Sequence, residues 1–288
     1  MDLNPSVIFY TDGLAVDALE TFALRVEELG YESLWVPEFF AREPFSTVAF
    51  LLARTTRVKV ATGIANVYAR DALVTAQCRQ TLAELSGGRF ILGLGVSHPP
   101  MAEAHGLAWI PAVPKMRAYL DTLESTVVAS PEPPLPAPIW IAAHGPGLLR
   151  LAARRASGAN AYLMPPAHTE KAREILGAEK RLNVVVPSCL CDDASLARRI
   201  GRRALAMYLP LPAYQQQWLQ WGFAETDFAD GGSDRLVDAL IAWGDEAKIR
   251  ARMLEHRAAG ASHIAVSPLN PEARGPVPHW KLLEALAP

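Results

Sequence analysis

Cysteine is scarce in this chain of 288 residues, because it occurs only three times. An odd and small number of cysteines does not build a disulfide framework, and Cys189 and Cys191 stand too close together for an ordinary disulfide or zinc knuckle. We therefore expect reduced thiols and a cytoplasmic location.

Net charge is also nearly absent. The chain carries 28 Lys and Arg against 30 Asp and Glu, a formal net charge of −2, so no overall field would attract nucleic acid or an anionic membrane surface. No apolar run approaches the roughly 18 residues of a transmembrane helix, and residues 1–5 have no basic region of a leader. We predict that the protein binds neither nucleic acid nor membranes.

The common catalytic signatures are missing as well. Gly93 and Gly95 lack the third glycine of a dinucleotide-binding fingerprint, and the chain has no nucleophile elbow and no Walker loop. His98, Glu103 and His105 do not have the spacing of a helical zinc-binding pair. No metal site is predicted.

What the chain does have is a regular alternation of short apolar runs and amphipathic segments. Candidate strands begin near Ser6, Ser33, Val58, Phe90, Ile139, Asn160, Asn183 and His263. Helical patterns lie between them, for example at 18–29, 73–85, 116–128 and 148–156. Eight strands alternating with helices predict an α/β fold, a single (β/α)8 TIM barrel over residues 1–288, better than an open doubly wound sheet.

Residues 192–261 depart from this rhythm, because they stand where one helix would suffice. They predict a helical insertion before the last strand, with an aromatic set made of Tyr208, Tyr214, Trp218, Trp221 and Phe223. Two interpretations are equally open. The insertion forms a lid over the carboxyl-end mouth, where barrels keep their sites, or it packs as a hairpin on the barrel or on a second subunit.

Glycine and polar residues near the strand ends mark a candidate site. The third strand carries Gly63 and Asn66, and the fourth contains two glycines and then delivers Ser97 and His98. Glycine inside a buried strand indicates the close approach of another backbone or of a ligand. Two such strands side by side suggest a flat molecule lying against the backbone.

Further candidates follow the second, fifth and sixth strands. Glu38 follows the second strand, while Met164 and Pro165 follow the sixth. The segment AAHGPG at 142–147 runs from the fifth strand directly into a helix, and free amides at a helix N-terminus favour an anion such as phosphate. Each residue also has a plainer interpretation as a helix cap or a turn residue.

Long segments throughout the chain share one resemblance. They are LGYESLWVPE at 29–38, TTRVKVATGIANVYARD at 55–71, LAELSGGRFILGLGVSHPP at 82–100, AAHGPGLLRLA at 142–152, SGANAYLMPPAHT at 157–169 and GGSDRLVDALIAWGD at 231–245. Together they resemble the luciferase-like flavin and deazaflavin oxidoreductases, and within these the branch that uses coenzyme F420.

The resemblance implies a (β/α)8 barrel, usually a homodimer, with the cofactor ring at the carboxyl-end mouth. It implies a cis peptide bond between Gly63 and Ile64. The implied ring contacts are Gly63, Ile64, Asn66, Ser97 and His98. The implied contacts to the phosphate and its tail are His144, Gly145, Pro146, Pro165, His168 and Thr169, with Met164 on the same rim.

One departure from the family pattern affects the chemistry. Several deazaflavin relatives carry an acidic residue followed by histidine after the second strand, whereas Glu38 is followed here by Phe39. Glu38 and His98 therefore remain as the acid/base candidates. We expect an F420-dependent oxidoreductase acting on a small organic substrate. The alternatives are an FMN-dependent monooxygenase of the same fold, or a flavin-binding protein without catalysis, for which a collapsed mouth is expected.

Overall fold

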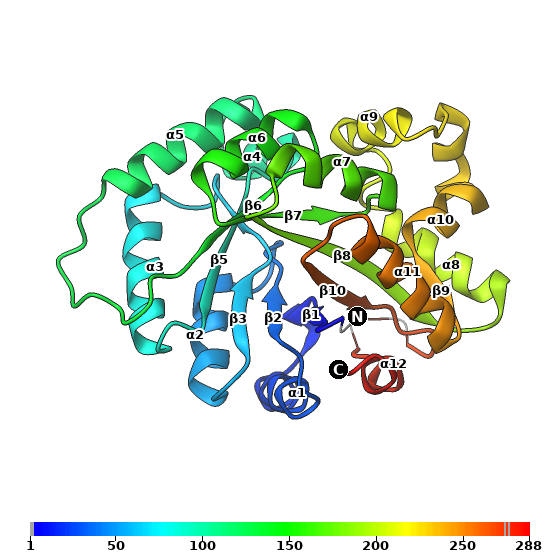
Figure 1. Ribbon diagram of the computed structural model, residues 1–288, viewed down its shortest axis with the longest axis horizontal. Helices are drawn as coiled ribbons and strands as arrows, with labels where there is room; N and C mark the ends of the chain where they lie inside the picture. The colour runs from blue at the N-terminus through cyan, green and yellow to red at the C-terminus, as the bar shows by residue number, and fades with distance from the viewer. Residues whose placement is uncertain (1–2, 274, 276) are drawn as a thin grey trace.

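The sheet closes on itself as a parallel barrel (Figure 1). The computed structural model describes residues 3–273, 275 and 277–288. The barrel strands are β1 (Ser6–Ile8), β2 (Ser33–Val36), β3 (Lys59–Thr62), β5 (Phe90–Gly95), β6 (Ile139–Ala142), β7 (Gly158–Tyr162), β8 (Arg181–Leu190) and β10 (His263–Pro268). Strand β10 pairs with both β8 and β1, which closes the ring. The predicted (β/α)8 TIM barrel is confirmed.

Helices cover the outside of the barrel. They are α1 (Val16–Glu28), α2 (Pro44–Arg54), α3 (Ala72–Leu85), α4 (Pro99–Ala104), α5 (Ala112–Ser125), α6 (Pro146–Arg155), α7 (Pro166–Leu176), α11 (Glu246–Ala258) and α12 (Trp280–Ala285), with the 3-10 turn η1 (Thr11–Gly13). Carboxylates start two of the helices near the site. Glu43 accepts backbone hydrogen bonds at the start of α2, and Asp71 does so at the start of α3.

Side chains fill the inside of the barrel. A buried cluster there consists of Trp35, Ala61, Ile91, Trp140, Val185 and Ala265. The ring centroids of Trp35 and Trp140 in this cluster lie 5.2 Å apart. The barrel is therefore a packed core rather than a pore, and a ligand has to bind at one of its ends.

The expected insertion is present, but it is not purely helical, and it ends before α11 rather than at residue 261, because α11 packs on the barrel. It contains α8 (Ala194–Leu205), α9 (Pro212–Gln220), the 3-10 segment η2 (Glu225–Gly231), α10 (Asp234–Leu240) and the short strand β9 (Ala242–Gly244). Strand β9 pairs with the last residues of β8, because β8 extends beyond the barrel and leaves an edge to be covered. The insertion lies to the right in Figure 1, in yellow-green to orange, and has an apolar core of its own around Trp218.

The third strand is interrupted by a bulge at the carboxyl end. Pairing with β5 runs from Ala61 opposite Ile91 to Ala65 opposite Leu94, so the chain from β3 to β4 (Ala65–Asn66) uses one residue more than its partner. Thr62 bridges the interruption, because its Oγ1 accepts from the N–H of Gly93 at 2.9 Å and donates to the Gly93 carbonyl at 2.7 Å. The bulge carries Gly63 and Ile64 into the mouth of the barrel.

We predict that Gly93→Ala disrupts this bulge. A Cβ at position 93 would lie 1.9 Å from the backbone oxygen of Thr62, so the two strands would have to move apart. We expect the free energy of unfolding, measured by urea denaturation, to fall by about 3 kcal/mol. Gly275→Ala is the control, because a Cβ there meets nothing within 4 Å. Equal stability of the two variants would contradict the account of the bulge.

Candidate active site

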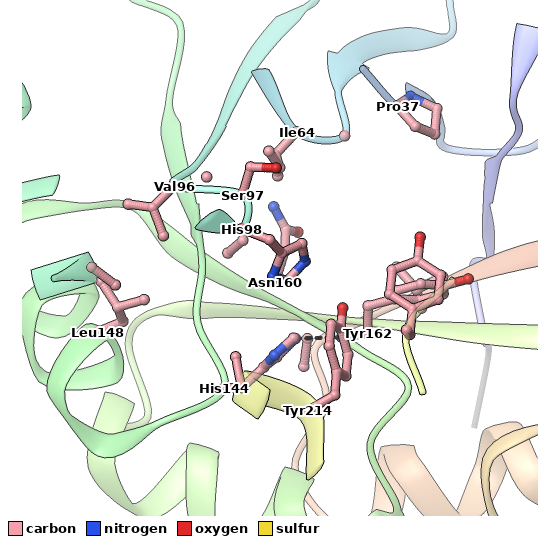
Figure 2. Close-up of a pocket in the computed structure, with 18 of the residues that line it drawn as sticks. Pro37, Ile64, Val96, Ser97, His98, His144, Leu148, Asn160, Tyr162 and Tyr214 are labelled. Carbon is pink, nitrogen blue, oxygen red and sulfur yellow. Dashed lines mark hydrogen bonds between the residues drawn. The ribbon is translucent and has the colours of Figure 1, made fainter. Parts of the chain in front are cut away.

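A cavity of about 420 Å³ opens at the carboxyl ends of the barrel strands. Among the predicted site residues, its lining includes Glu38, Gly63, Ile64, Ser97, His98, His144 and Gly145. In Figure 2, Ile64 and Ser97 lie on the upper side of the cavity and His144 and Tyr214 on the lower side, with His98 between them. Residues that are far apart in the sequence thus face one space.

The bulge supplies one wall of the cavity. The peptide bond between Gly63 and Ile64 is cis, so this prediction is confirmed. Gly95 lies behind the bulge, and a Cβ there would stand 2.5 Å from the side chain of Ile64. The protein's own packing therefore already requires this glycine, without a ligand. Ser97 next to it has a φ of 57°, and uncommon backbone angles of this kind cluster at functional sites.

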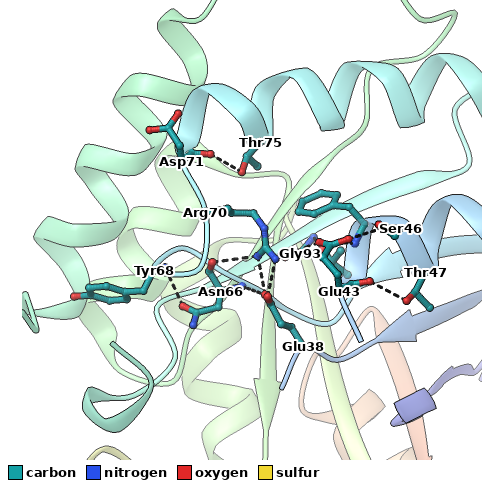
Figure 3. Close-up of polar contacts among 12 residues, drawn as sticks. Glu38, Glu43, Ser46, Thr47, Asn66, Tyr68, Arg70, Asp71, Thr75 and Gly93 are labelled. Atoms are coloured by element: carbon teal, nitrogen blue, oxygen red, sulfur yellow. Dashed lines mark hydrogen bonds and ion pairs between the residues drawn. The ribbon is translucent and has the colours of Figure 1, made fainter. Parts of the chain in front are cut away.

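The Glu38 carboxylate holds the segments around the bulge together (Figure 3). Arg70 donates to its two oxygens, at 2.7 and 2.6 Å, and the backbone N–H of Asn66 donates to Oε2 at 2.5 Å. Arg70 also donates to the backbone oxygen of Asn66 and to the Glu43 carboxylate. The side chains of Glu38 and Arg70 are only 10% and 12% exposed, so water screens this ion pair weakly.

This pairing favours a positioning role for Glu38 over proton transfer. Protonating its carboxylate would break a bidentate ion pair, and such pairs are among the stronger polar contacts in proteins. The Oδ1 of Asn66 accepts from the N–H of Tyr68 at 3.0 Å, while its Nδ2 is buried with no partner among the described residues. Glu38 lines the cavity and holds the backbone of Asn66 behind it, and the direct roles predicted for both residues remain predictions.

Two histidines face the cavity in their neutral forms. Burial lowers the pKa of His98 below its usual value of 6.5. Burial, and then the charges of His168 and His98, lowers the pKa of His144 to about 3. The Nε2 of His144 accepts from the backbone N–H of Tyr162 at 3.3 Å, so its proton lies on Nδ1. Both imidazoles are thus uncharged at neutral pH.

Helix α6 begins at the rim of the cavity. Gly145 is its N-cap and Pro146 has no N–H, so Gly147 and Leu148 present the first amides without an acceptor inside the helix. Gly145, Gly147 and Leu148 all line the cavity. A Cβ on Gly145 would meet only Nε2 of Gln217 within 4 Å, at 3.7 Å, so this backbone is open to a ligand. The helix end predicted to hold a phosphate does face the cavity.

The insertion completes the wall opposite the bulge. Tyr208 and Tyr214 line the cavity, and the ring of Tyr214 lies 5.7 Å from that of His98 and 5.0 Å from that of His144. Trp218 anchors this part of the insertion by donating from Nε1 to the Leu163 oxygen at 2.9 Å. Tyr208 and Tyr214 thus line the cavity, whereas Trp218 packs in a core that the insertion shares with Leu163 and Met164. The choice between a lid and a hairpin packed on the barrel or on a second subunit stays open.

Other predicted cofactor contacts do not line this cavity. They are Asn66, Pro146, Met164, Pro165, His168 and Thr169. His168 donates from Nε2 to the His144 oxygen at 2.8 Å, and Oγ1 of Thr169 lies 2.8 Å from Nδ1 of His256. Met164 packs in the core of the insertion. These residues support the rim from behind, and contacts between them and a cofactor remain predictions.

Sequence reasoning missed several lining residues. Asn160 and Asn183 form the floor, where Nδ2 of Asn183 donates to Oδ1 of Asn160 at 3.0 Å. The Nδ2 of Asn160 and the Oδ1 of Asn183 are buried without a partner among the described residues. An asparagine within an apolar strand was the available signal for both. Tyr10 and Tyr162 also line the cavity, but tyrosine is common in strands and gave no signal.

Comparison with known proteins identifies the family. The sequence model of the luciferase-like monooxygenase family matches residues 6–263. The chain belongs to this luciferase-like family. It is 25% identical over 293 residues to the 5,10-methylenetetrahydromethanopterin reductase of Methanolobus tindarius, an alignment that covers 87% of this chain and 90% of that protein.

Solved structures of similar fold include members with different cofactors. The coenzyme F420-dependent tetrahydromethanopterin reductase of Methanopyrus kandleri superposes with a TM-score of 0.74 at 17% identity, covering 100% of this chain and 98% of that one. The oxygenating constituent of 3,6-diketocamphane monooxygenase from Pseudomonas putida, in complex with FMN, gives 0.73 at 15% identity, with 99% and 97% covered. These similarities show the fold of the luciferase-like family.

The structure also bears on disulfides, metal sites and membrane-spanning helices within the described residues. Cys78, Cys189 and Cys191 are free thiols. Within the described residues, no group of three or more His, Cys, Asp or Glu is placed to hold a metal ion. None of the helices described has the length and apolar character needed to cross a bilayer.

We predict that Arg70→Met destabilises the protein strongly. The change leaves the Glu38 carboxylate shielded and without its cation, so the free energy of unfolding should fall by about 3 to 5 kcal/mol. The control is Lys171→Met, which removes an ion pair with Glu174 whose side chains are 59% and 57% exposed. It should cost less than about 1 kcal/mol. Chemical denaturation of both variants checks this, and similar losses would contradict the central place given to Glu38.

Proposed function

We propose that the protein is an F420-dependent oxidoreductase acting on a small organic substrate. One observation carries the proposal: the backbone wall at Gly63 and Ile64 and the free amides at the start of α6 line the same open cavity. A deazaflavin cofactor has a flat ring and a phosphate, and these two features suit a flat wall and a helix N-terminus. The F420-dependent reductase among the structural relatives supports the same choice.

The residues present fit such a cofactor. The open backbone at Gly145, with no Cβ in the way, lets a phosphate approach the amides of Gly147 and Leu148. The bulge at Gly63 and Ile64 would take one face of the ring. The bound deazaflavin would supply a hydride carrier that reacts little with oxygen, while the protein supplies position and electrostatics.

His98 is the residue that we assign to proton transfer. It lines the cavity, and the ring of Tyr214 is its aromatic neighbour at 5.7 Å. Burial keeps its imidazole neutral, so in the free protein it is prepared to accept a proton rather than to give one. This state suits the oxidation of an alcohol-type substrate, which must lose a hydroxyl proton. Glu38 would act through Arg70 and Asn66 by holding the wall in place.

An FMN-dependent monooxygenase is the second candidate. It is favoured by the FMN-bound structural relative and by the cavity's lining. None of the described lining residues is Lys or Arg, so the longer acidic tail of F420 would have to lie outside the cavity. A flavin-binding protein without catalysis is less well supported, because the mouth holds an open cavity rather than a collapsed one. The homodimer and the cytoplasmic location stay predictions.

We predict that Gly145→Asp weakens cofactor binding without unfolding the protein. A carboxylate at the N-cap would accept from the α6 amides, stabilise the helix and repel a phosphate. We expect wild-type protein to bind F420 more tightly than FMN, and the variant to bind F420 about 10- to 100-fold more weakly. Fluorescence titration measures both, with Gly145→Ala as control.

Two results of this titration would count against the proposal. Unchanged F420 affinity in Gly145→Asp would show that the phosphate does not bind at the N-terminus of α6. Micromolar binding of FMN to the wild-type protein, without measurable F420 binding, would favour the monooxygenase.

We predict that His98→Ala lowers turnover by about 10²- to 10⁴-fold while the affinity for cofactor changes only a few fold. Because the pKa of His98 is lowered, the rate of substrate oxidation should rise with pH below 6.5 and be level above it. The variant should lose this dependence. Steady-state kinetics between pH 5 and 8 check both points. Collapsed affinity with surviving turnover at saturating cofactor would make His98 a binding residue.

A further inference from the structure

The insertion contributes a wall that the barrel alone does not provide. Tyr208 and Tyr214 face the cavity from it, together with the exposed side chains of Met207 and Gln216. Tyr214 is buried and packs against Trp218, which is fixed by its hydrogen bond to Leu163. This wall is therefore ordered by contacts within the protein, and it lies on the side opposite the proposed ring wall at Ile64 (Figure 2). A substrate above the ring would have to touch it.

The cavity offers no unpaired charge to such a substrate. Glu38 is the one acidic residue among the described lining residues, and Arg70 neutralises it. The His98 and His144 imidazoles are neutral. Burial raises the pKa of the lining tyrosines, so their hydroxyls stay protonated. Moving a charged group from water into these surroundings would be costly, because no counter-charge awaits it.

A hydroxyl pair gives the cavity one specific polar contact. Tyr10, which follows β1, and Tyr208, in the insertion, have their hydroxyl oxygens 2.7 Å apart. The hydroxyl of Tyr162, whose ring lies 5.2 Å from that of Tyr208, also hydrogen-bonds the Tyr208 hydroxyl. The three hydroxyls carry three hydrogens and the two bonds between them use two, so one remains for a further acceptor. Tyr214 connects this pair to the proton-transfer candidate, since its ring lies 5.1 Å from that of Tyr208 and 5.7 Å from that of His98.

We propose that the substrate is an uncharged molecule with a carbonyl or hydroxyl oxygen, and that the hydroxyl pair of Tyr10 and Tyr208, together with the Tyr162 hydroxyl bonded to it, binds this oxygen. The insertion is then the element that selects the substrate, while the barrel holds the cofactor. This inference deepens the proposed function and rests on the same cavity. It assigns to Tyr208 a specificity role that no catalytic signature in the sequence indicates.

Matched small probes test the charge requirement. Cyclohexanone is neutral, whereas 4-oxocyclohexanecarboxylate has the same ring and ketone with an added negative charge at pH 7.5. Isothermal titration into F420-loaded protein should give binding of cyclohexanone, with the anion at least 10-fold weaker. Equal or tighter binding of the anion, or no binding of cyclohexanone at saturating F420, would overturn the inference.

The variant Tyr208→Phe tests the hydroxyl pair. It should weaken the binding of cyclohexanone about 3- to 10-fold, which corresponds to the usual net contribution of one hydrogen bond. It should leave the affinity for F420 unchanged, as well as that for methylenecyclohexane, which has the same shape without the oxygen. Tyr10→Phe should reproduce the effect. Tyr31→Phe is the matched control, because Tyr31 is a buried tyrosine whose hydroxyl binds the Leu283 oxygen instead. An unchanged ketone affinity in both Tyr10→Phe and Tyr208→Phe would refute the assignment.

The two proposals can fail separately. If F420 does not bind, the proposed function fails, and the same titrations on cofactor-free protein still test whether the cavity prefers the neutral ketone. If F420 binds and the ketone shows no preference, only the inference about the substrate fails.

Discussion

The ion pair between Glu38 and Arg70 is the contact on which the geometry of the barrel mouth depends. It joins the segment after β2 to the loop between β4 and α3, and through the N–H of Asn66 it fixes the strand that follows the bulge. The bulge has one residue too many for regular pairing with β5, so its shape needs support from outside the sheet. Glu38 supplies that support from the neighbouring strand. The flat wall of the cavity follows from this arrangement.

The second constraint is the neutrality of the cavity. Burial keeps His98 and His144 uncharged and keeps the lining tyrosines protonated. The permanent polarity left in the cavity then comes from backbone amides at α6, from the Asn160 and Asn183 amides and from hydroxyl groups. Such a site separates its tasks in space. The free amides of Gly147 and Leu148 lie at the rim, while the imidazoles and hydroxyls of the interior are uncharged.

The fold and the position of the site could be predicted from the sequence for a physical reason. Strands buried on both faces are almost continuously apolar, so the eight strands and the polar residues after them stand out along the chain. Gly63 within the third strand predicted the close approach of another backbone or of a ligand, but not the bulge itself. Family resemblance, rather than any pattern of the residues alone, supplied the cis bond and the cofactor.

The remaining features depend on contacts between distant segments, which local patterns do not encode. The partner of Glu38 is Arg70, and nothing near Glu38 in the sequence indicates it. His168 and Thr169 follow a strand end as expected, but their side chains bind His144 and His256 behind the rim. The hydroxyl pair joins Tyr10 to Tyr208, which are 198 residues apart in the sequence. Strand β9 formed because β8 extends beyond the barrel.

The central claim is that the bulge and the start of α6 together form a deazaflavin site. A crystal structure of the protein with coenzyme F420 bound tests it most directly. The account predicts the ring against Gly63 and Ile64 and the phosphate at the amides of Gly147 and Leu148. A phosphate bound instead in the loops after β8 and β10, the commoner place in barrels of this type, would contradict it.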